Sequence, residues 1–419
     1  MANVRPNGAL VSREMRGWIL AAAGLGCFLA GVWVTHSRKV HATTVTREAA
    51  NTAPPAHTTT DDRASSPTAT GVTLSLVYSA EIAEWLRPAL DGFERAHPDV
   101  RVQAQPMGSL DAERAIANGR VRPTLWIPAD TTAVEMLDAD RGAQGAAVVR
   151  EEGRWPRALT LTPMVFVVWE SRARALAGEA TTLSWTRLQT VARSPRGWTE
   201  VGGERAWGGL KFGHTDPTRS HAGLNALVLM AYGWRGTARS LAPADVTGAG
   251  FEGFVRTLEA ADPAGDRGTG SSGEFAQTIA LQGPGRYDVA MVYESQAIAS
   301  MDIARGRWGE SLRVYYPPVN VWSDHPLCLL DGAHVGAAER EAADKLADHL
   351  RSREVQAAAV GHGLRPADAR VPIVSDDPEN PFVKYRDRGV TVALPQVADA
   401  PSLAALDAIT TAWRRATGR

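Results

Sequence analysis

From residue 72 onward, the hydrophobic pattern switches repeatedly between the period of a β-strand and the period of an α-helix. Alternating or short apolar runs predict strands at 73–78, 100–104, 123–128, 159–169, 210–213, 287–293 and 313–320. Apolar residues three and four apart predict helices at 82–93, 110–118, 182–193, 223–232, 242–260, 274–282, 337–360 and 399–419. The first strand, helix and strand form a βαβ unit, so the sequence predicts a parallel sheet and an α/β fold.

The N-terminal part of the chain has a different pattern. Residues 17–35 contain no charged residue and are just long enough to span a membrane as a helix, so we expect a transmembrane signal anchor with 1–16 in the cytoplasm and the bulk extracytoplasmic. A cleavable signal peptide and a lipoprotein signal at Cys27 are the alternatives. Residues 36–71 are mostly Thr, Ala, Pro and Ser, which predicts a flexible linker.

Length and charge narrow the function classes. At 419 residues the chain exceeds the usual size of one core, so two lobes are expected. The net charge of -1 gives no support to nucleic-acid binding. The ten histidines form no zinc motif with each other or with Cys27 and Cys328, and neither a GxSxG motif nor a cofactor fingerprint is present. We therefore predict no metal, no cofactor and no catalysis. A Ser220–histidine pair with His214 or His221 is the alternative that would make the chain a hydrolase.

The stretch 207–232 (WGGLKFGHTDPTRSHAGLNALVLMAY) predicts a helix start that follows a short strand. Asp216, Thr218 and Ser220 are residue types that favour N-caps, and Pro217 suits the first turn. Free amides at a helix start, with the positive end of the dipole behind them, suit an anion or a polar oxygen. The hydroxyl groups here either bind a ligand or only cap the helix.

Three other stretches place hydroxyl groups at comparable positions. Ser79 follows the first strand, and Ser109 follows the second, where ligands of parallel sheets usually bind. The turn 268–273 (GTGSSG) opens another helix with Ser271 and Ser272. It lacks the Lys-Ser/Thr ending of a phosphate-binding P-loop, and Glu274 would repel a phosphate.

These motifs together resemble a known family. LSLVYS, PTLWIPAD, LKFGHTDPTRSHAGLNAL, GSSG, YDVAMVYES and REVQAAAVGHGLRP, over about 72–366, resemble the extracellular solute-binding proteins of ABC-type uptake systems, in the branch also found fused to von Willebrand A domains. The resemblance implies the α/β type II periplasmic-binding-protein fold, with two lobes joined by two crossing segments. We expect the first lobe at 72–165, the second at 166–315, and the return to the first lobe with the C-terminal helices at 316–419.

The resemblance also implies a non-catalytic site in the cleft between the lobes. The expected ligand-binding residues are Ser79, Ser109, Thr215, Asp216, Thr218, Ser220, Ser271, Ser272, Tyr293 and Glu294. If Asp216 and Glu294 face the cleft, a cationic ligand or metal ion fits; if they point away, an oxyanion is the better interpretation. The expected partners are a small molecule or ion, an ABC permease or a von Willebrand A-type protein, and the membrane. An interaction or sensing module with a degenerate cleft is the alternative function.

Overall fold

The computed structural model describes residues 71–142, 145–263 and 271–419, all within one compact unit, Ser66–Arg419. The predicted membrane anchor at 17–35 and nearly all of the predicted linker lie outside these residues. None of the helices in the described part has both the length and the apolar character needed to cross a membrane.

The first sheet has the strand order β2-β1-β3-β11-β4, and β5 also pairs with β11. β1 is parallel to β2 and β3, whereas β11 is antiparallel to its neighbours. The βαβ unit predicted from the sequence is therefore present. The strands are β1 (Val72–Tyr78), β2 (Val100–Pro106), β3 (Leu125–Ile127), β4 (Ala147–Val148), β5 (Arg157–Ala158) and β11 (Pro326–Asp331).

The second sheet is built around β6, whose continuous apolar run is buried along almost its full length. Its order is β10-β6-β8-β7, and β9 and β12 also pair with β6. Only the β7–β8 pair is parallel among the described pairs of this sheet. The strands are β6 (Thr160–Trp169), β7 (Phe212–Gly213), β8 (Val289–Tyr293), β9 (Leu312–Tyr315), β10 (Trp322–Ser323) and β12 (Arg365–Pro366).

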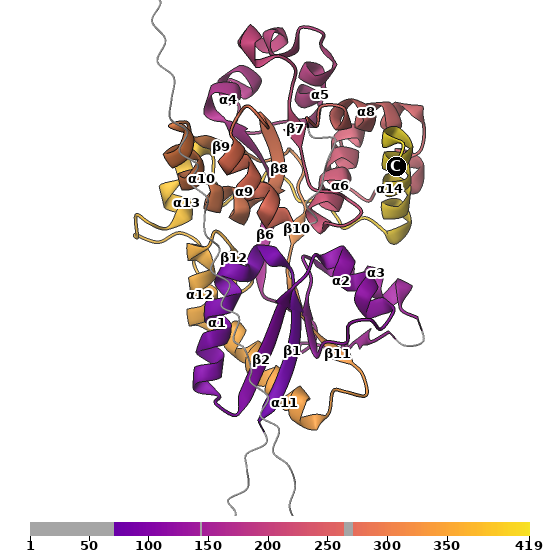
Figure 1. Cartoon of the computed structure of the whole chain (residues 1–419), viewed down its shortest axis with the longest axis vertical. Helices are drawn as coiled ribbons and strands as arrows, with labels where there is room; N and C mark the ends of the chain where they lie inside the picture. The colour runs from indigo at the N-terminus through magenta and orange to yellow at the C-terminus, as the bar shows by residue number, and fades with distance from the viewer. Residues whose placement is uncertain (1–70, 143–144, 264–270) are drawn as a thin grey trace, which may run out of the picture. The chain divides into compact units, whose positions relative to one another are not determined.

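Helices cover both faces of each sheet, which gives two α/β/α lobes (Figure 1). The first lobe comprises the first sheet with η1 (Ala80–Ile82), α1 (Ala83–Ala96), α2 (Ser109–Ala117), α3 (Thr131–Asp140), α11 (Ala337–Leu350) and α12 (Arg353–Gly361). The second lobe comprises the second sheet with α4 (Glu170–Ala177), α5 (Trp185–Arg193), η2 (Gly197–Val201), η3 (Arg205–Trp207), α6 (His221–Arg235), α7 (Pro243–Val246), α8 (Ala249–Glu259), α9 (Ser272–Gln282), α10 (Glu294–Trp308), α13 (Pro381–Lys384), η4 (Arg386–Arg388) and α14 (Leu403–Thr417).

In the described residues, the chain passes between the sheets at three places. β5 is followed by β6, β10 is followed by β11, and α12 is followed by β12. The first two passages correspond to the two crossing segments that we expected, and the third is additional. The sheets also divide the chain earlier than the expected boundary at 165, because β6 already pairs with β12 and β10 from Thr160 onward.

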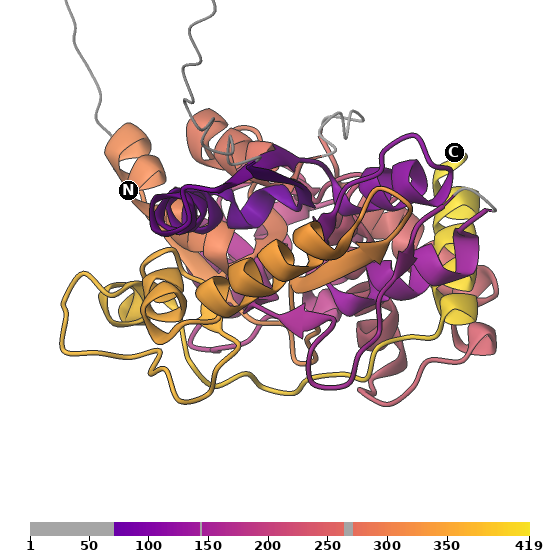
Figure 2. The same cartoon turned by 90° about the horizontal axis from the view of Figure 1, so that it is seen from below.

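The C-terminal segment belongs to the second lobe rather than returning to the first. α14 packs against α6, α7 and α8. In Figure 2, the yellow segment that joins α13 to α14 runs along the lower edge of the view, and the C-terminus lies at the end of α14. The segment is held on the way by backbone bonds from the Asn320 amide to the Gln396 carbonyl and from the Ala398 amide to the Asn320 carbonyl, both 2.8 Å.

The helices of the structure differ from the predicted ones in number and extent. The helix expected over 337–360 is two helices, because the Ser352 hydroxyl accepts a bond from the Val355 amide and starts α12. The helix α10 was not expected, and its buried residues lie on most of its circumference rather than on one face. A helix of this kind shows little of the 3.6-residue period that the prediction relies on.

Candidate functional site

A small cavity of about 230 Å³ lies between the two lobes. Six of the expected ligand-binding residues line it, two from the first lobe and four from the second: Ser79, Ser109, Ser220, Ser271, Ser272 and Tyr293. Five of the six are less than 9% exposed, and Ser271 is partly buried. The cavity therefore brings together residues that are up to about 200 positions apart in the sequence.

Each of these residues stands where a strand or loop gives way to a helix. Ser79 follows β1 and precedes η1, and Ser109 is the first residue of α2. Ser220 and Ser271 are the N-caps of α6 and α9, and Tyr293 is the N-cap of α10. Helix N-termini from both lobes thus border one cavity, and each brings free backbone amides and a positive dipole end.

In the first lobe, the serine hydroxyls are already used as donors. The Ser109 hydroxyl donates to the Ser79 oxygen at 3.1 Å and accepts a bond from the Ala129 amide at 2.9 Å. The Ser79 hydroxyl donates to Oε2 of Glu81 at 2.6 Å. This relay ends on a carboxylate, so neither serine hydrogen is directed toward a ligand.

In the second lobe, the serine oxygens accept bonds, which leaves their hydrogens for another partner. Ser220 accepts from the Thr215 hydroxyl at 2.9 Å, and Ser272 accepts from the Gln296 amide at 2.9 Å. Ser271 accepts from the backbone amide of Glu274 at 3.4 Å. Because a hydroxyl carries one hydrogen, each of these three serines is a donor toward an acceptor in the cavity. This wall therefore favours a ligand rich in oxygen acceptors.

His221 adds a charged donor to the same wall. Its side chain is nearly fully buried, and Nε2 lies 2.7 Å from Oδ2 of Asp130 in the first lobe. Burial alone would lower the pKa of His221, but the Asp130 carboxylate raises it above the ordinary value. The pKa of Asp130 is correspondingly lowered, since the pair with His221 and the bond from Asn225 outweigh its burial. Each partner therefore favours the charged form of the other, an imidazolium facing a carboxylate.

One further buried pair includes Glu81, a carboxylate that lines the cavity. Oε1 of Glu81 is 3.1 Å from Nε2 of His325, which lies in the passage between β10 and β11. Burial would raise the pKa of Glu81, but His325 and the Ser79 hydroxyl lower it below its usual range. Both Glu81 oxygens therefore already have partners within the protein, and the carboxylate has little remaining capacity to bind a cation.

Two expected acidic ligand-binding residues, Asp216 and Glu294, do not line the cavity. Oδ1 of Asp216 accepts bonds from the amide and the hydroxyl of Thr218, at 2.8 and 2.7 Å, and so closes its own turn. Glu294 is fully buried and forms a two-point ion pair with Arg365, at 2.8 Å from Nε and 2.7 Å from Nη2. Asp216 and Glu294 thus point away from the cavity, which is the arrangement for which the sequence favoured an oxyanion over a cation.

Thr215 and Thr218 also lie outside the lining. Thr215 supports the cavity indirectly, because its hydroxyl bonds to Ser220. The Thr218 carbonyl accepts a bond from the Arg114 guanidinium of α2, so its turn is a contact between the lobes. α6 begins at His221, after the Pro217 that was expected in its first turn, and the Ser220 side chain makes no cap bond to it.

Gly223 explains how this turn can sit so close to α6. A Cβ atom at Gly223 would lie 2.3 Å from the Thr215 carbonyl oxygen and 2.8 Å from the Pro217 nitrogen. No side chain other than hydrogen fits between the helix and the turn. The glycine of the HAGL motif therefore sets the position of Ser220 and His221.

The residue that the sequence interpretation missed is His221, which it considered only as the partner of a catalytic serine. In the structure, Ser220 bonds to Thr215, and His214 bonds to Oε1 of Glu259 at 2.8 Å. The sequence did carry a signal, since His221 follows directly after the predicted N-cap. Its partner Asp130, 91 positions away, had no such signal. Across the described ranges, no three His, Cys, Asp or Glu residues are grouped to hold a metal ion.

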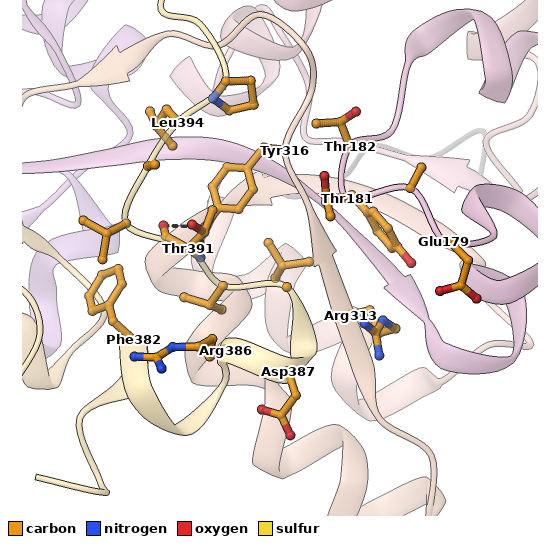
Figure 3. A pocket seen from close by; sticks show the side chains of 18 of the residues that line it. Glu179, Thr181, Thr182, Arg313, Tyr316, Phe382, Arg386, Asp387, Thr391 and Leu394 are labelled. Carbon is orange, nitrogen blue, oxygen red and sulfur yellow. Dashed lines mark hydrogen bonds between the residues drawn. The ribbon is translucent and has the colours of Figure 1, made fainter.

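A second and larger cavity, of about 1070 Å³, shares no residue with the first. It lies in the second lobe beside β9, between the turn around Thr181 and the segment 386–395 (Figure 3). Its charged lining is mixed: Figure 3 shows Arg313 and Arg386 with Glu179 and Asp387. None of the expected site residues lines it, and the one residue of its lining that begins a helix of eight or more described residues is acidic, Glu170 of α4. We therefore place the candidate site in the smaller cavity.

Two α/β lobes around a small polar cavity are the arrangement of a two-lobed binding protein. Residues 74–365 match the family described as bacterial extracellular solute-binding protein. Because the match extends over more than half of the chain, the chain belongs to this family. The family of extracellular solute-binding proteins expected from the sequence motifs is thus confirmed, and its von Willebrand A-related branch stays a prediction.

The curated relatives are two uncharacterized proteins of Mycobacterium tuberculosis strains, each 24% identical over 321 residues. The aligned part is 72% of this chain but only 43% of each relative, so the chain spans less than half of their length.

Solved structures show the same fold at low sequence identity. The sulfate-binding protein SubI of Mycobacterium tuberculosis has a TM-score of 0.52 at 18% identity, over 80% of this chain and 96% of that one. Maltose-bound MalE3 of T. maritima has a TM-score of 0.54 at 13% identity, over 83% and 94%. The ferric binding protein of Campylobacter jejuni has a TM-score of 0.53 at 11% identity, over 82% and 99%. These three proteins differ in ligand, so the likeness concerns the fold alone.

Proposed function

We propose that this chain binds a small oxyanion in the 230 Å³ cavity between its lobes, without catalysis, for uptake or sensing outside the cytoplasm. The observation that carries the proposal is the direction of the hydrogen bonds in the second lobe. Ser220, Ser271 and Ser272 each already accept a bond, so their hydrogens are left for a ligand. An oxyanion supplies several acceptors within a volume of this size.

The charges near the cavity support the same ligand class. The Asp130 carboxylate raises the pKa of His221 and so favours its cationic form, and the Glu81 carboxylate of the lining is engaged by His325 and Ser79. Glu274 also contributes to the lining, but it lies on the exposed side of α9. Asp216 and Glu294 are bonded within the protein instead of facing the cavity. The hydrogen-bond donors on this wall attract an anion and repel a cation.

The location and the partners form part of the proposal. The apolar segment 17–35 supplies a membrane anchor in this account, and 36–71 a linker long enough to let the lobes reach a membrane partner. The lobes resemble the type II periplasmic-binding-protein fold with hinge closure around the ligand. An ABC permease is the partner that fits this class, and a von Willebrand A-type partner stays a prediction from the sequence resemblance.

Isothermal titration calorimetry of the purified full-length chain tests the proposal. Sulfate, phosphate and molybdate are compared with Mg²⁺, Ca²⁺ and the neutral sugar maltose at constant ionic strength. We expect at least one oxyanion to bind with 1:1 stoichiometry, and Ser272→Ala to weaken it by roughly tenfold. Ser240→Ala, at an exposed serine outside the cavity lining, is the matched control and leaves the affinity unchanged. Binding of cations only, or of no compound in the panel, would refute the oxyanion proposal.

A further inference from the structure

His221 joins the two lobes at the wall of the cavity. The residue begins α6 in the second lobe, and its partner Asp130 is the N-cap of α3 in the first lobe. The two side chains are 2% and 6% exposed, and the atoms Nε2 and Oδ2 are 2.7 Å apart. Asp130 is itself held in place, since Oδ1 accepts the Thr132 amide at 2.9 Å and Oδ2 accepts from Asn225 at 3.2 Å. The carboxylate thus fixes the orientation of the imidazole ring.

The second ring nitrogen has no such partner. Neither ring nitrogen meets hydrogen-bond geometry with a described residue, but Nε2 has the Asp130 carboxylate as an ion-pair partner at 2.7 Å, whereas Nδ1 is buried with no partner among the described residues, although His221 lines the cavity. A buried ring nitrogen without a partner is unfavourable unless a ligand satisfies it. With Nε2–H held toward Asp130, Nδ1 carries either a hydrogen, in the imidazolium, or a lone pair, in the neutral ring. The charge state of His221 therefore decides whether Nδ1 attracts or repels a ligand oxygen.

Other charged groups also face this ring from the elements around it. The carboxylates that act on it are Asp130 before α3, Glu81 of η1 and Asp324 between β10 and β11, whereas His325 pairs with Glu81, and Tyr293 and Glu274 share the cavity lining with His221. The carboxylates nearest to it favour the imidazolium, and Asp130 contributes most because it is in direct contact. A ligand anion at Nδ1 would add a second negative partner to the same ring.

We propose that His221 is the residue that selects ligands by charge: its imidazolium, positioned by Asp130, donates a hydrogen bond from Nδ1 to an oxygen of the bound oxyanion. This inference rests on the proposed function and names the group that makes the site anion-selective. Asp130 is a positioning residue, since it acts through His221. The pair also couples the two lobes, because the ring that contacts the ligand is held by the opposite lobe.

The proposal predicts a specific pH dependence. Binding requires protonated His221, so affinity is full below the pKa of His221 in the free protein and falls as pH rises through it. Above that pKa, each pH unit weakens binding by about tenfold, and each bound anion takes up one proton. Sulfate is the suitable probe, because its own charge does not change from about pH 5 to about pH 9.

The experiment measures sulfate and phosphate affinity of the full-length chain by calorimetry across this pH range, in two buffers of different ionisation enthalpy to count protons. For His221→Gln, we expect sulfate binding at low pH to weaken by roughly 10- to 100-fold and its pH dependence to disappear. For Asp130→Asn, which keeps the N-cap oxygen, we expect near-normal affinity at low pH and a midpoint shifted to lower pH. A merely structural Asp130 would leave the midpoint unchanged. His334→Gln, at a histidine outside the cavity lining, is the matched control.

Failure of the inference and failure of the proposed function give different results. If the wild-type chain binds sulfate or phosphate, but without pH dependence and equally well as His221→Gln, the role of His221 is refuted while the cavity remains an anion site. If neither anion binds the wild-type chain at any pH, the oxyanion function fails and the inference fails with it. Circular dichroism of each variant establishes that a loss of affinity does not come from unfolding.

Discussion

The buried ion pair between Glu294 and Arg365 offers a sharp test, because the sequence placed Glu294 in the ligand site and the structure gives it another role. Besides the two bonds to Glu294, the Arg365 guanidinium donates to the carbonyls of Thr391, at 2.7 Å, and Val392, at 2.5 Å. The Tyr316 hydroxyl also bonds to Glu294. This cluster ties β12 and the start of α10 to the segment that leads toward α14.

Glu294→Gln keeps the shape of the side chain and removes its charge, which leaves a buried guanidinium without a counter-ion. Removing one partner of a buried ion pair destabilises a protein by about 3–5 kcal/mol, and the two carbonyls favour the lower end of this range. A cooperative unit of roughly 350 residues has an unfolding entropy near 0.7 kcal/mol per degree, so the melting temperature should fall by about 4–7 °C. Affinity for the oxyanion should change less than about twofold, because Glu294 does not line the cavity.

Differential scanning calorimetry and titration of the same sample check both statements. Arg370→Ala is the control, because Arg370 pairs with Asp368 at the surface with its side chain 87% exposed; its melting temperature should match the wild type. Glu294→Gln combined with Arg365→Met should be less destabilised than Glu294→Gln alone, since no unpaired charge stays buried. An unchanged melting temperature together with lost ligand binding would show that Glu294 is a ligand residue and that our placement is wrong.

Three further predictions concern other positions. Gly223→Ala should reduce stability and weaken oxyanion binding by more than tenfold in calorimetry, because its Cβ would collide with the Thr215 carbonyl. The control Gly306→Ala, which has open space on α10, should be neutral or stabilise the protein by about 0.4–1 kcal/mol. Burial, and then Asp140, raise the pKa of Glu113 to about 7, so the native state favours the protonated acid and stability falls as pH rises from about 4.5 to about 7. Glu113→Gln should therefore raise the melting temperature at pH 8 and leave it unchanged at pH 4. An equal gain at both pH values would contradict this. Asp288→Ala should lower the melting temperature strongly in the same scans, because it strands the buried guanidinium of Arg172 at 3.1 Å, and a shift below about 2 °C would be contrary to expectation.

Strands and helices with a clear period were predictable from the sequence alone. The run 159–169 predicted a buried strand, and β6 occupies Thr160–Trp169, because a continuous apolar run of that length fits a strand covered on both faces. The helix after the GSSG turn was also predicted, and α9 spans Ser272–Gln282. Local pattern is sufficient in such cases, since the partner of the apolar face does not need to be known.

The candidate site was predictable only as far as local position decides it. Ser79, Ser109 and Ser220 meet at the cavity because strand ends and helix starts of α/β sheets gather at the same edge. Glu294 has the same local position, yet it turns to Arg365, which lies 71 positions later. His221 depends likewise on a carboxylate that only the tertiary fold brings near. Partners distant in sequence therefore decide which polar side chains face the ligand and which are bonded within the protein.

Anomalous diffraction from crystals of the full-length chain grown with selenate, a heavier analogue of sulfate, would locate the bound anion. We expect one strong selenium peak in the cavity between the lobes, with the selenate oxygens within hydrogen-bonding distance of the hydroxyls of Ser220 and Ser272 and of Nδ1 of His221. A peak confined to the larger cavity beside Arg313, or no ordered peak between the lobes at saturating selenate, would contradict it.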